Sequence, residues 1–180
     1  MNTDLILILD AAAFAARKHR QQRRKDAEAS PYINHPLALA DILAREGGID
    51  DARTIAAALL HDTIEDTETT VEELEARFGK RVAAIVFEVT DDKSLPKDER
   101  KRLQINKAAS KSREAKLVKL ADKISNLRDL ISTPPADWRD ARKMEYFQWA
   151  NEVVSGLRGV NASLEAAFDE VYALGMAAMK

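Results

Sequence analysis

A histidine and an aspartate, His61 and Asp62, stand together where an apolar segment gives way to a polar one. Residues 56–60 read Ala-Ala-Ala-Leu-Leu, and the dipeptide follows directly. Adjacent residues cannot share one helix face, but at a helix end both side chains can turn towards one metal ion as nitrogen and oxygen ligands. The dipeptide alone also fits a capping or surface His-Asp pair. A metal site is therefore one of two interpretations.

Two carboxylates, Glu65 and Asp66, lie one helical turn beyond the dipeptide, within reach of anything bound there. Crowded carboxylates repel each other and take up protons unless a cation offsets their charge. The cluster therefore indicates a bound divalent metal or a role in proton transfer. The alternative is a solvated acidic helix end with threonine caps.

Two further segments carry side chains of the same kind. His35 stands in a turn-rich stretch and is followed by a proline, while Asp122 and Asn126 share one face of an apolar helical stretch. An aspartate among apolar residues is costly to bury without a partner, which a metal ion supplies. A salt bridge from Asp122 to Lys119 or Lys123 is the other interpretation.

The elements that must position these side chains are helices, because apolar residues recur at helical spacing nearly throughout the chain. From Leu5 to Ala16 they fall on one face of an opening helix. Capping and breaking signals predict further helices at about residues 36–45, 51–64, 70–79, 81–89, 97–109, 115–130, 136–157 and 160–179. The expected fold is all-α, a bundle of about nine helices in a single domain, residues 1–180.

Composition narrows the class of protein. The chain has 180 residues, of which 46% are hydrophobic and 32% charged, with no cysteine, so any metal must bind through nitrogen and oxygen. A net charge of −2 argues against a surface tuned for nucleic acid, although basic residues gather in residues 17–25. The longest apolar stretches, residues 5–9 and 56–60, are far shorter than the roughly 20 residues of a membrane span. We expect no membrane partner and a cytoplasmic location.

Three motifs occur in the order in which one known family carries them. They are Asn-His-Pro at 34–36, HDTIEDT at 61–67 and LADKISNLR at 120–128. With these motifs the chain resembles the HD-domain phosphohydrolases. Within them it is similar to the RelA/SpoT hydrolase domain, and most of all to its stand-alone branch, the small alarmone hydrolases that include the metazoan SpoT homologue. The resemblance extends over stretches at 14–25, 89–97 and 146–150.

The resemblance implies a metal-dependent hydrolase with an HD-domain helical bundle. One divalent metal, Mn²⁺ in this family, would be held by four ligands: His35, His61, Asp62 and Asp122. Glu65 and Asp66 would orient and deprotonate the attacking water. The reaction implied is removal of the 3′-pyrophosphate from guanosine tetra- or pentaphosphate (ppGpp or pppGpp), which gives pyrophosphate and GDP or GTP.

Other residues match positions near the family's substrate. Arg24 would pack against the purine, Lys25 would lie near the phosphates, and Asn126 would contact the nucleoside. Further candidates for substrate contact are Lys97, Arg142 and Tyr146. We interpret His19 as a structural residue.

Two other functions stay open. The metazoan-like branch suggests an NADPH 2′-phosphatase in the same site. A non-catalytic nucleotide- or RNA-binding module would use the basic stretches at 17–25 and 97–102, but the intact metal and acid residues speak against it. Because the chain ends at Lys180, without the synthetase domain of the long family members, synthesis of the alarmone is not expected.

Overall fold

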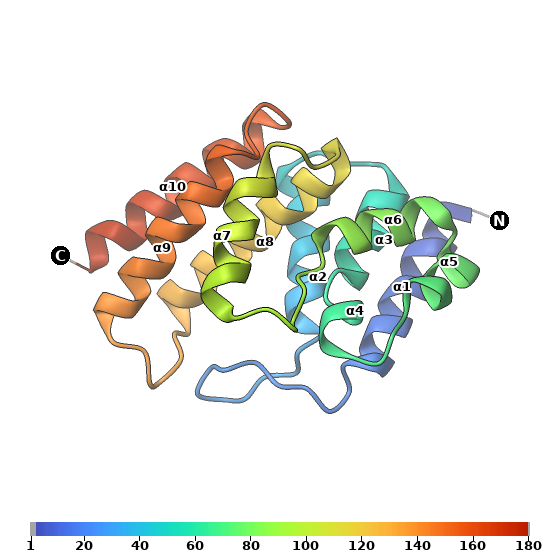
Figure 1. Ribbon diagram of the computed structural model, residues 1–180, viewed down its shortest axis with the longest axis horizontal. Coiled ribbons are helices and arrows are strands. Elements are labelled where there is room, and N and C mark those ends of the chain that lie inside the picture. Colours follow the sequence, from blue (N-terminus) through green and yellow to red (C-terminus); the bar gives the residue numbers. More distant parts are fainter. Residues whose placement is uncertain (1–2, 180) are drawn as a thin grey trace.

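Helices account for nearly all regular structure in the computed structural model, which describes residues 3–179 (Figure 1). In this range the only β pairing is an isolated bridge between Arg23 and Pro31. The elements are α1 (Thr3–Lys18), α2 (Asn34–Asp41), a π-helical turn η1 (Ile42–Glu46), α3 (Ala52–Leu60), α4 (Thr63–Asp66), α5 (Val71–Phe78), α6 (Lys80–Val89), α7 (Lys97–Ala108), α8 (Arg113–Ser132), α9 (Asp140–Ser155) and α10 (Ala162–Ala178). The all-α expectation is confirmed.

The third expected helix is interrupted at the His-Asp dipeptide. α3 ends at Leu60, and α4 begins at Thr63, so His61 and Asp62 lie in the break between them. The Thr63 hydroxyl donates to the Leu60 carbonyl at 2.7 Å, which satisfies a carbonyl at the break. The break lets two adjacent side chains turn to the same side, which a continuous helix forbids.

Side-chain caps fix several helix ends as the sequence predicts. Asp51 accepts the backbone N–H three residues on at 3.1 Å and starts α3. The Thr70 hydroxyl accepts the backbone N–H of Glu73 at 3.2 Å and starts α5. The Glu73 carboxylate pairs with Lys18, so only half of a capping box forms. Gly79, at a φ of 85°, joins α5 to α6 in a backbone conformation that favours glycine.

α1 buries a different face from the one that its apolar spacing predicts. Leu5 and Leu9 are 53% and 58% exposed, whereas Ala11, Phe14 and Ala15 are buried. The Phe14 ring meets the Phe78 ring edge-on, with centroids 5.3 Å apart. Because α1 is apolar on most sides, the large aromatic residue decides which face is buried.

The central helix is α8, which contacts α2, α3, η1, α6, α9 and α10. It contributes Leu117, Leu120, Ile124 and Leu127 to the core, all with no exposed surface. Full burial of each such side chain stabilises the fold by about 1.5–3 kcal/mol. α8 is therefore a rigid support for any polar side chain that it carries into the site.

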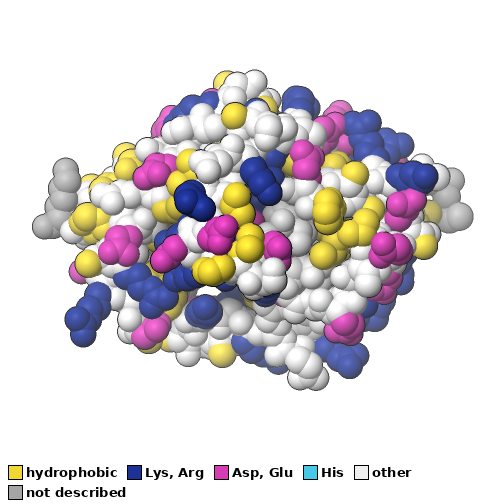
Figure 2. All heavy atoms as spheres, in the orientation of Figure 1, with side chains coloured by type: hydrophobic (Ala, Val, Ile, Leu, Met, Phe, Trp, Pro, Cys, Tyr) yellow, Lys and Arg dark blue, Asp and Glu magenta, His cyan; other side chains and the backbone are white. Residues whose placement is uncertain are grey.

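The surface carries mixed charge. Figure 2 shows acidic and basic side chains interspersed over one face, with no histidine visible there. All three histidines are buried, at 5% exposure or less. Among the helices of residues 3–179, none is both long enough and apolar enough to span a bilayer.

Candidate active site

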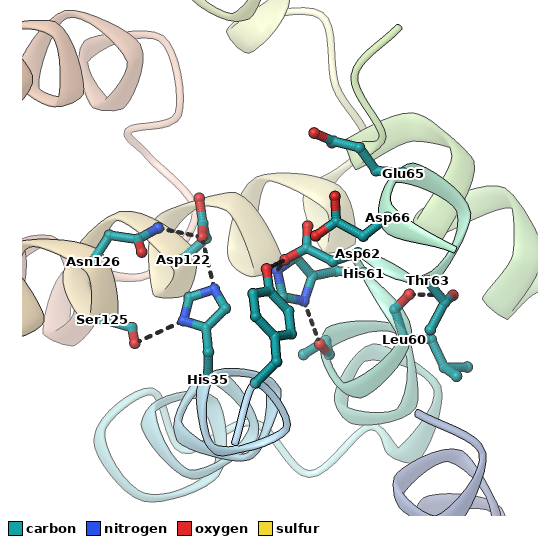
Figure 3. Close-up of polar contacts among 12 residues, drawn as sticks. His35, Leu60, His61, Asp62, Thr63, Glu65, Asp66, Asp122, Ser125 and Asn126 are labelled. Carbon is teal, nitrogen blue, oxygen red and sulfur yellow. Dashed lines mark hydrogen bonds and ion pairs between the residues drawn. The ribbon is translucent and has the colours of Figure 1, made fainter. Parts of the chain in front are cut away.

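Three side chains form a group that could hold a metal ion: His35, His61 and Asp62. One ligand atom of each lies within 4.8 Å of the others. His35 comes from the first turn of α2, and the other two from the break between α3 and α4 (Figure 3). Both histidines are almost fully buried, at 4% and 5% exposure. The fold thus joins two of the three sequence motifs into one group.

Hydrogen bonds to the second ring nitrogen orient both histidines. His61 Nδ1 donates to the Ala58 carbonyl at 2.8 Å, and His35 Nδ1 lies 3.3 Å from the Ser125 hydroxyl. His61 Nε2 is buried and has no hydrogen-bond partner, although an Asp62 oxygen is 2.8 Å away. A divalent cation would satisfy this nitrogen, and a ring fixed through its other nitrogen is the usual arrangement of a histidine ligand. The donor set therefore fits a metal.

Asp122 adjoins the metal-binding group without belonging to it. Its Oδ1 lies 3.3 Å from His35 Nε2 and accepts from Asn126 Nδ2 at 2.6 Å. Its Oδ2 lies 3.0 Å from Lys123 Nζ. The carboxylate therefore faces the group and also makes the salt bridge that the sequence left open. Its role as a fourth ligand stays a prediction.

Electrostatics favour ionised carboxylates in this group. Burial acts to raise the pKa of Asp62, but the charge of His61 outweighs it, and the pKa falls below its usual range. Burial also acts to raise the pKa of Asp122, but the charge of Lys123 outweighs burial, and the pKa lies well below its usual range. For His35, burial lowers the pKa and favours the neutral ring, whereas at His61 burial is outweighed by the Asp62 carboxylate, which raises the pKa. Ionised carboxylates and neutral imidazole are the forms that bind metals.

Glu65 is held from a different part of the chain. Its Oε2 accepts from the backbone N–H of Asp91 at 3.1 Å, and its Oε1 lies 3.9 Å from Arg100 Nη1. Burial, followed by the charge of Asp62, raises the pKa of Glu65 above its ordinary value. A carboxylate with a raised pKa is a better proton acceptor, as general base catalysis requires.

Asp66 is fixed by two side chains that the sequence analysis did not select. Gln22 Nε2 donates to one carboxylate oxygen at 2.7 Å, and Lys93 pairs with the other. Gln22 in turn lies 2.7 Å from Nδ1 of His19, which is 1% exposed. This supporting position of His19 agrees with its structural interpretation.

A cavity of about 660 Å³ lies beside these groups. Six of the predicted site residues line it: Arg24, Lys25, His35, Asp66, Asn126 and Tyr146. Lys97 and Arg142 do not line the cavity. The Arg142 guanidinium nevertheless lies 4.2 Å above the ring of Trp138, and Trp138 does line it. Of the metal-binding group and the acid pair, only His35 and Asp66 line this cavity, whose volume suits a nucleotide; His61, Asp62, Glu65 and Asp122 do not line it.

Comparison with known proteins places the chain in a family. The HD-domain profile matches residues 11–151. A Xenopus tropicalis protein named guanosine-3′,5′-bis(diphosphate) 3′-pyrophosphohydrolase MESH1 is 61% identical over 172 residues, which is 96% of each chain. The chain belongs to the MESH1 group of the HD-domain family. The human MESH1 protein of the same name is 56% identical over 96% of each chain.

The fold agrees with that of a solved MESH1-like protein. A structure described as a metazoan ortholog of SpoT that hydrolyses ppGpp superposes with a TM-score of 0.91. It is 50% identical, and the match covers 93% of this chain and 94% of that one. The resemblance drawn from the three motifs is therefore confirmed, and with it the HD-domain bundle. The HD domain implies a divalent metal, for which His35, His61 and Asp62 form a suitable group.

In this HD-domain protein Arg24 is held at the cavity wall. Its Nη2 pairs with Asp129 and lies 3.4 Å from Asn126 Oδ1. Its guanidinium lies 5.8 Å above the ring of Tyr32. The loop that carries Arg24 is closed by its backbone N–H, which donates to the Ser30 carbonyl at 2.9 Å. A planar guanidinium fixed on two sides can present its face to a flat ligand.

Tyr32 is a site residue of this HD domain that the sequence analysis missed. Its hydroxyl donates to Oδ2 of Asp62. Burial, followed by the Asp62 carboxylate, raises the pKa of Tyr32, so the phenol stays protonated. Only its place three residues before His35, in the turn-rich stretch, could have drawn attention to it. The contact itself depends on the fold.

Proposed function

We propose that this HD-domain protein is a Mn²⁺-dependent 3′-pyrophosphohydrolase of ppGpp and pppGpp. The observation that carries the proposal is that His35 and Asp66 line the same cavity as Arg24. One member of the metal-binding group, one of the acid pair and a planar cation thus face one ligand-sized space. The names of the MESH1 relatives, at 55–61% identity for the vertebrate proteins of frog, human and mouse, support the same reaction.

We infer that four side chains would hold the metal: His35, His61, Asp62 and Asp122. Imidazole and carboxylate ligands without sulfur suit Mn²⁺, and the family favours it over Zn²⁺ and iron, which accept the same ligand types. When bound, a divalent cation supplies Lewis-acid neutralisation of phosphate charge. Tyr32 and Ser125 would steady Asp62 and His35 from behind.

In the proposed reaction, Glu65 takes a proton from the attacking water. The water oxygen forms a bond to the phosphorus joined to the ribose 3′ oxygen, and the bond between that phosphorus and the 3′ oxygen breaks. The 3′ oxygen leaves with a proton as the hydroxyl of GDP or GTP, and the transferred group leaves as pyrophosphate. Asp66, held by Gln22 and Lys93, would orient the water.

The nucleoside would lie against Arg24 and Asn126, which share the cavity wall with Tyr146. Lys25 is exposed at the cavity, where its ammonium could meet phosphates. Lys97 and Arg142 stay candidates for contact with parts of the substrate that extend beyond the cavity. We also propose that residues 1–180 act as one cytoplasmic hydrolase domain without synthetase activity.

The test is a substrate panel. Purified protein is incubated with ppGpp, pppGpp or NADPH, in the presence of Mn²⁺, Zn²⁺ or a chelator, and the products are identified by chromatography. We expect pyrophosphate with GDP or GTP in Mn²⁺, and none with Glu65→Ala or with chelator. No pyrophosphate from the wild type would contradict the proposal, and faster release of phosphate from NADPH would favour the 2′-phosphatase.

The alternative function, a non-catalytic nucleotide- or RNA-binding module, is tested separately by measuring RNA binding against salt concentration. Binding that falls steeply with salt and survives replacement of both His61 and Asp62 by Ala would favour a nucleic-acid function. We expect no such binding, because the chain carries a net charge of −2 and the face shown in Figure 2 mixes both signs.

A further inference from the structure

Lys119 on α8 is a buried lysine that the reaction outlined above does not use. It is 8% exposed, and no described carboxylate lies within 4 Å of its ammonium, which also makes no hydrogen bond to a described residue. Lys123, one turn further on, is buried too, but it pairs with Asp122 at 3.0 Å and lies 4.3 Å above the Trp149 ring. The Lys119 side chain is buried, but its Nζ keeps contact with solvent, so this unpaired ammonium is open to an anionic ligand.

The place of Lys119 connects it to the site. It lies three positions before Asp122 and seven before Asn126, on the helix face that carries both of these residues. Its charge helps to lower the pKa of Asp122, and it acts against the rise that burial causes in the pKa of Glu65. In Figure 3, Glu65 and Asp122 lie on opposite sides of the His61-Asp62 dipeptide. Lys119 is close enough for its charge to act on both the proposed base and the proposed fourth ligand.

Two other cations lie near Glu65 or Lys119. Arg100 Nη1 is 3.9 Å from Glu65, and the Nε of Arg100 is buried without a hydrogen-bond partner. Burial lowers the pKa of Lys111, and the charge of nearby Lys119 lowers it further. Arg100 is thus paired with Glu65, and Lys111 donates to the Glu88 carbonyl, whereas no described carboxylate pairs with Lys119, and an anionic ligand would supply its partner.

We propose that Lys119 binds a non-bridging oxygen of the phosphoryl group that is transferred to water, and retains pyrophosphate after cleavage. The inference rests on the proposed function and adds a residue to it. An ammonium carried beside the site by the rigid helix α8 neutralises charge that develops on the transferred group. Lys119 forms no covalent bond in this role, because it acts through charge and hydrogen bonding alone.

The test compares Lys119→Met, which removes the charge and nearly keeps the length, with Lys116→Met on the same helix as a matched control. Inorganic pyrophosphate binding to the Mn²⁺-loaded proteins is measured by calorimetry, beside kcat for ppGpp. For Lys119→Met we expect kcat to fall about a hundredfold, as for loss of one charge-stabilising donor, and pyrophosphate to bind at least about tenfold more weakly. Mn²⁺ affinity should stay at the wild-type value, and Lys116→Met should change none of these quantities.

A purely structural role for Lys119 predicts a different result. The variant would then unfold at a lower temperature, while the folded fraction kept wild-type pyrophosphate affinity, and this outcome would overturn the inference. If Lys119→Met does not fold, Lys119→Gln, which keeps a polar end, is measured in the same way. A wild type inactive on ppGpp contradicts the proposed function, whereas an active variant with unchanged pyrophosphate affinity contradicts the role of Lys119 alone.

Discussion

The hydroxyl of Tyr32 donates a hydrogen bond to the carboxylate of Asp62, across 30 positions of sequence. The same ring lies 6.0 Å from the ring of His35, so one aromatic side chain adjoins two of the three residues in the metal-binding group. A phenol that stays protonated can only donate to this carboxylate, and it therefore fixes which oxygen remains for a cation. Tyr32 orients a ligand without being one.

Removing this hydroxyl should weaken metal binding more than it weakens the fold. For Tyr32→Phe we expect Mn²⁺ affinity to fall by roughly tenfold or more, the usual effect of losing a group that orients a ligand. The free energy of unfolding should drop by only about 1 kcal/mol, since one hydrogen bond is lost. Calorimetric titration and urea unfolding measure the two quantities. Tyr172→Phe in α10 is the control, and equal Mn²⁺ affinity in all three proteins would show that Tyr32 does not orient Asp62.

The raised pKa of Glu65 predicts where activity is lost in acid. Glu65 accepts a proton only when ionised, so the rate should fall as pH decreases through its folded pKa, which lies above the ordinary value of about 4.3. The measurement is kcat against pH at saturating Mn²⁺. Glu65→Gln should lose at least about a hundredfold in kcat at every pH. A rate that stays constant down to the ordinary glutamate range would contradict this assignment.

The same shift has a consequence for stability. A carboxyl group whose pKa is raised on folding contributes stability below its unfolded pKa, and this contribution is lost as pH rises through the folded pKa. Glu65→Gln should therefore melt at a higher temperature than the wild type at neutral pH. The difference should vanish below about pH 4, where both side chains are neutral. Melting curves at several pH values check it, and a less stable variant at neutral pH would show that Glu65 stabilises the fold instead.

Arg24 should govern substrate affinity through its shape as well as its charge. Arg24→Lys keeps the charge but loses the plane that lies over Tyr32 and the fork that reaches Asp129. We expect KM to rise by roughly tenfold, in line with the loss of a stacked guanidinium, while Mn²⁺ affinity is unchanged. Arg20→Lys is a matched control, since Arg20 is exposed and does not line the cavity. Equal KM values for the two variants would contradict a role for Arg24 at the nucleoside.

A change far from the site should affect stability alone. A methyl group on Gly175 would lie 2.0 Å from Cε1 of Phe147, so the buried ring would have to move. Gly175→Ala should lower the free energy of unfolding by about 1–3 kcal/mol, the usual cost of overpacking, with kcat unchanged where the protein is folded. Urea unfolding measures it. In a Phe147→Leu background, Gly175→Ala should lower the free energy of unfolding by less. An equal decrease in both backgrounds would show that the strain does not come from the Phe147 ring.

The sequence predicted the helices well because their capping and apolar spacing are local properties. It placed His61 and Asp62 near the end of the third helix, but it did not predict the short helix α4 that follows them. It also selected the wrong face of α1, where apolar residues occur on most sides and only the contact between Phe14 and Phe78 distinguishes them. Tertiary packing decided both points.

The candidate site was predictable as far as residue type and spacing carry information. His35, His61 and Asp62 do come together, and Asp122 lies beside them. The supporting residues were not found, because neither a tyrosine nor a glutamine on a loop is unusual in type. Gln22 reaches Asp66 over 44 positions, and only the folded chain shows which oxygen it contacts.

The loop that follows α1 makes side-chain contacts with two distant parts of the chain. Through Gln22 it is joined to the acid pair, and through Arg24 it is joined to Asp129, 105 positions away. Each contact closes a long stretch of chain, whereas helices form from neighbours. A partly folded chain can therefore show most of its helical signal and still be inert, and recovery of turnover during refolding reports the final docking of this loop.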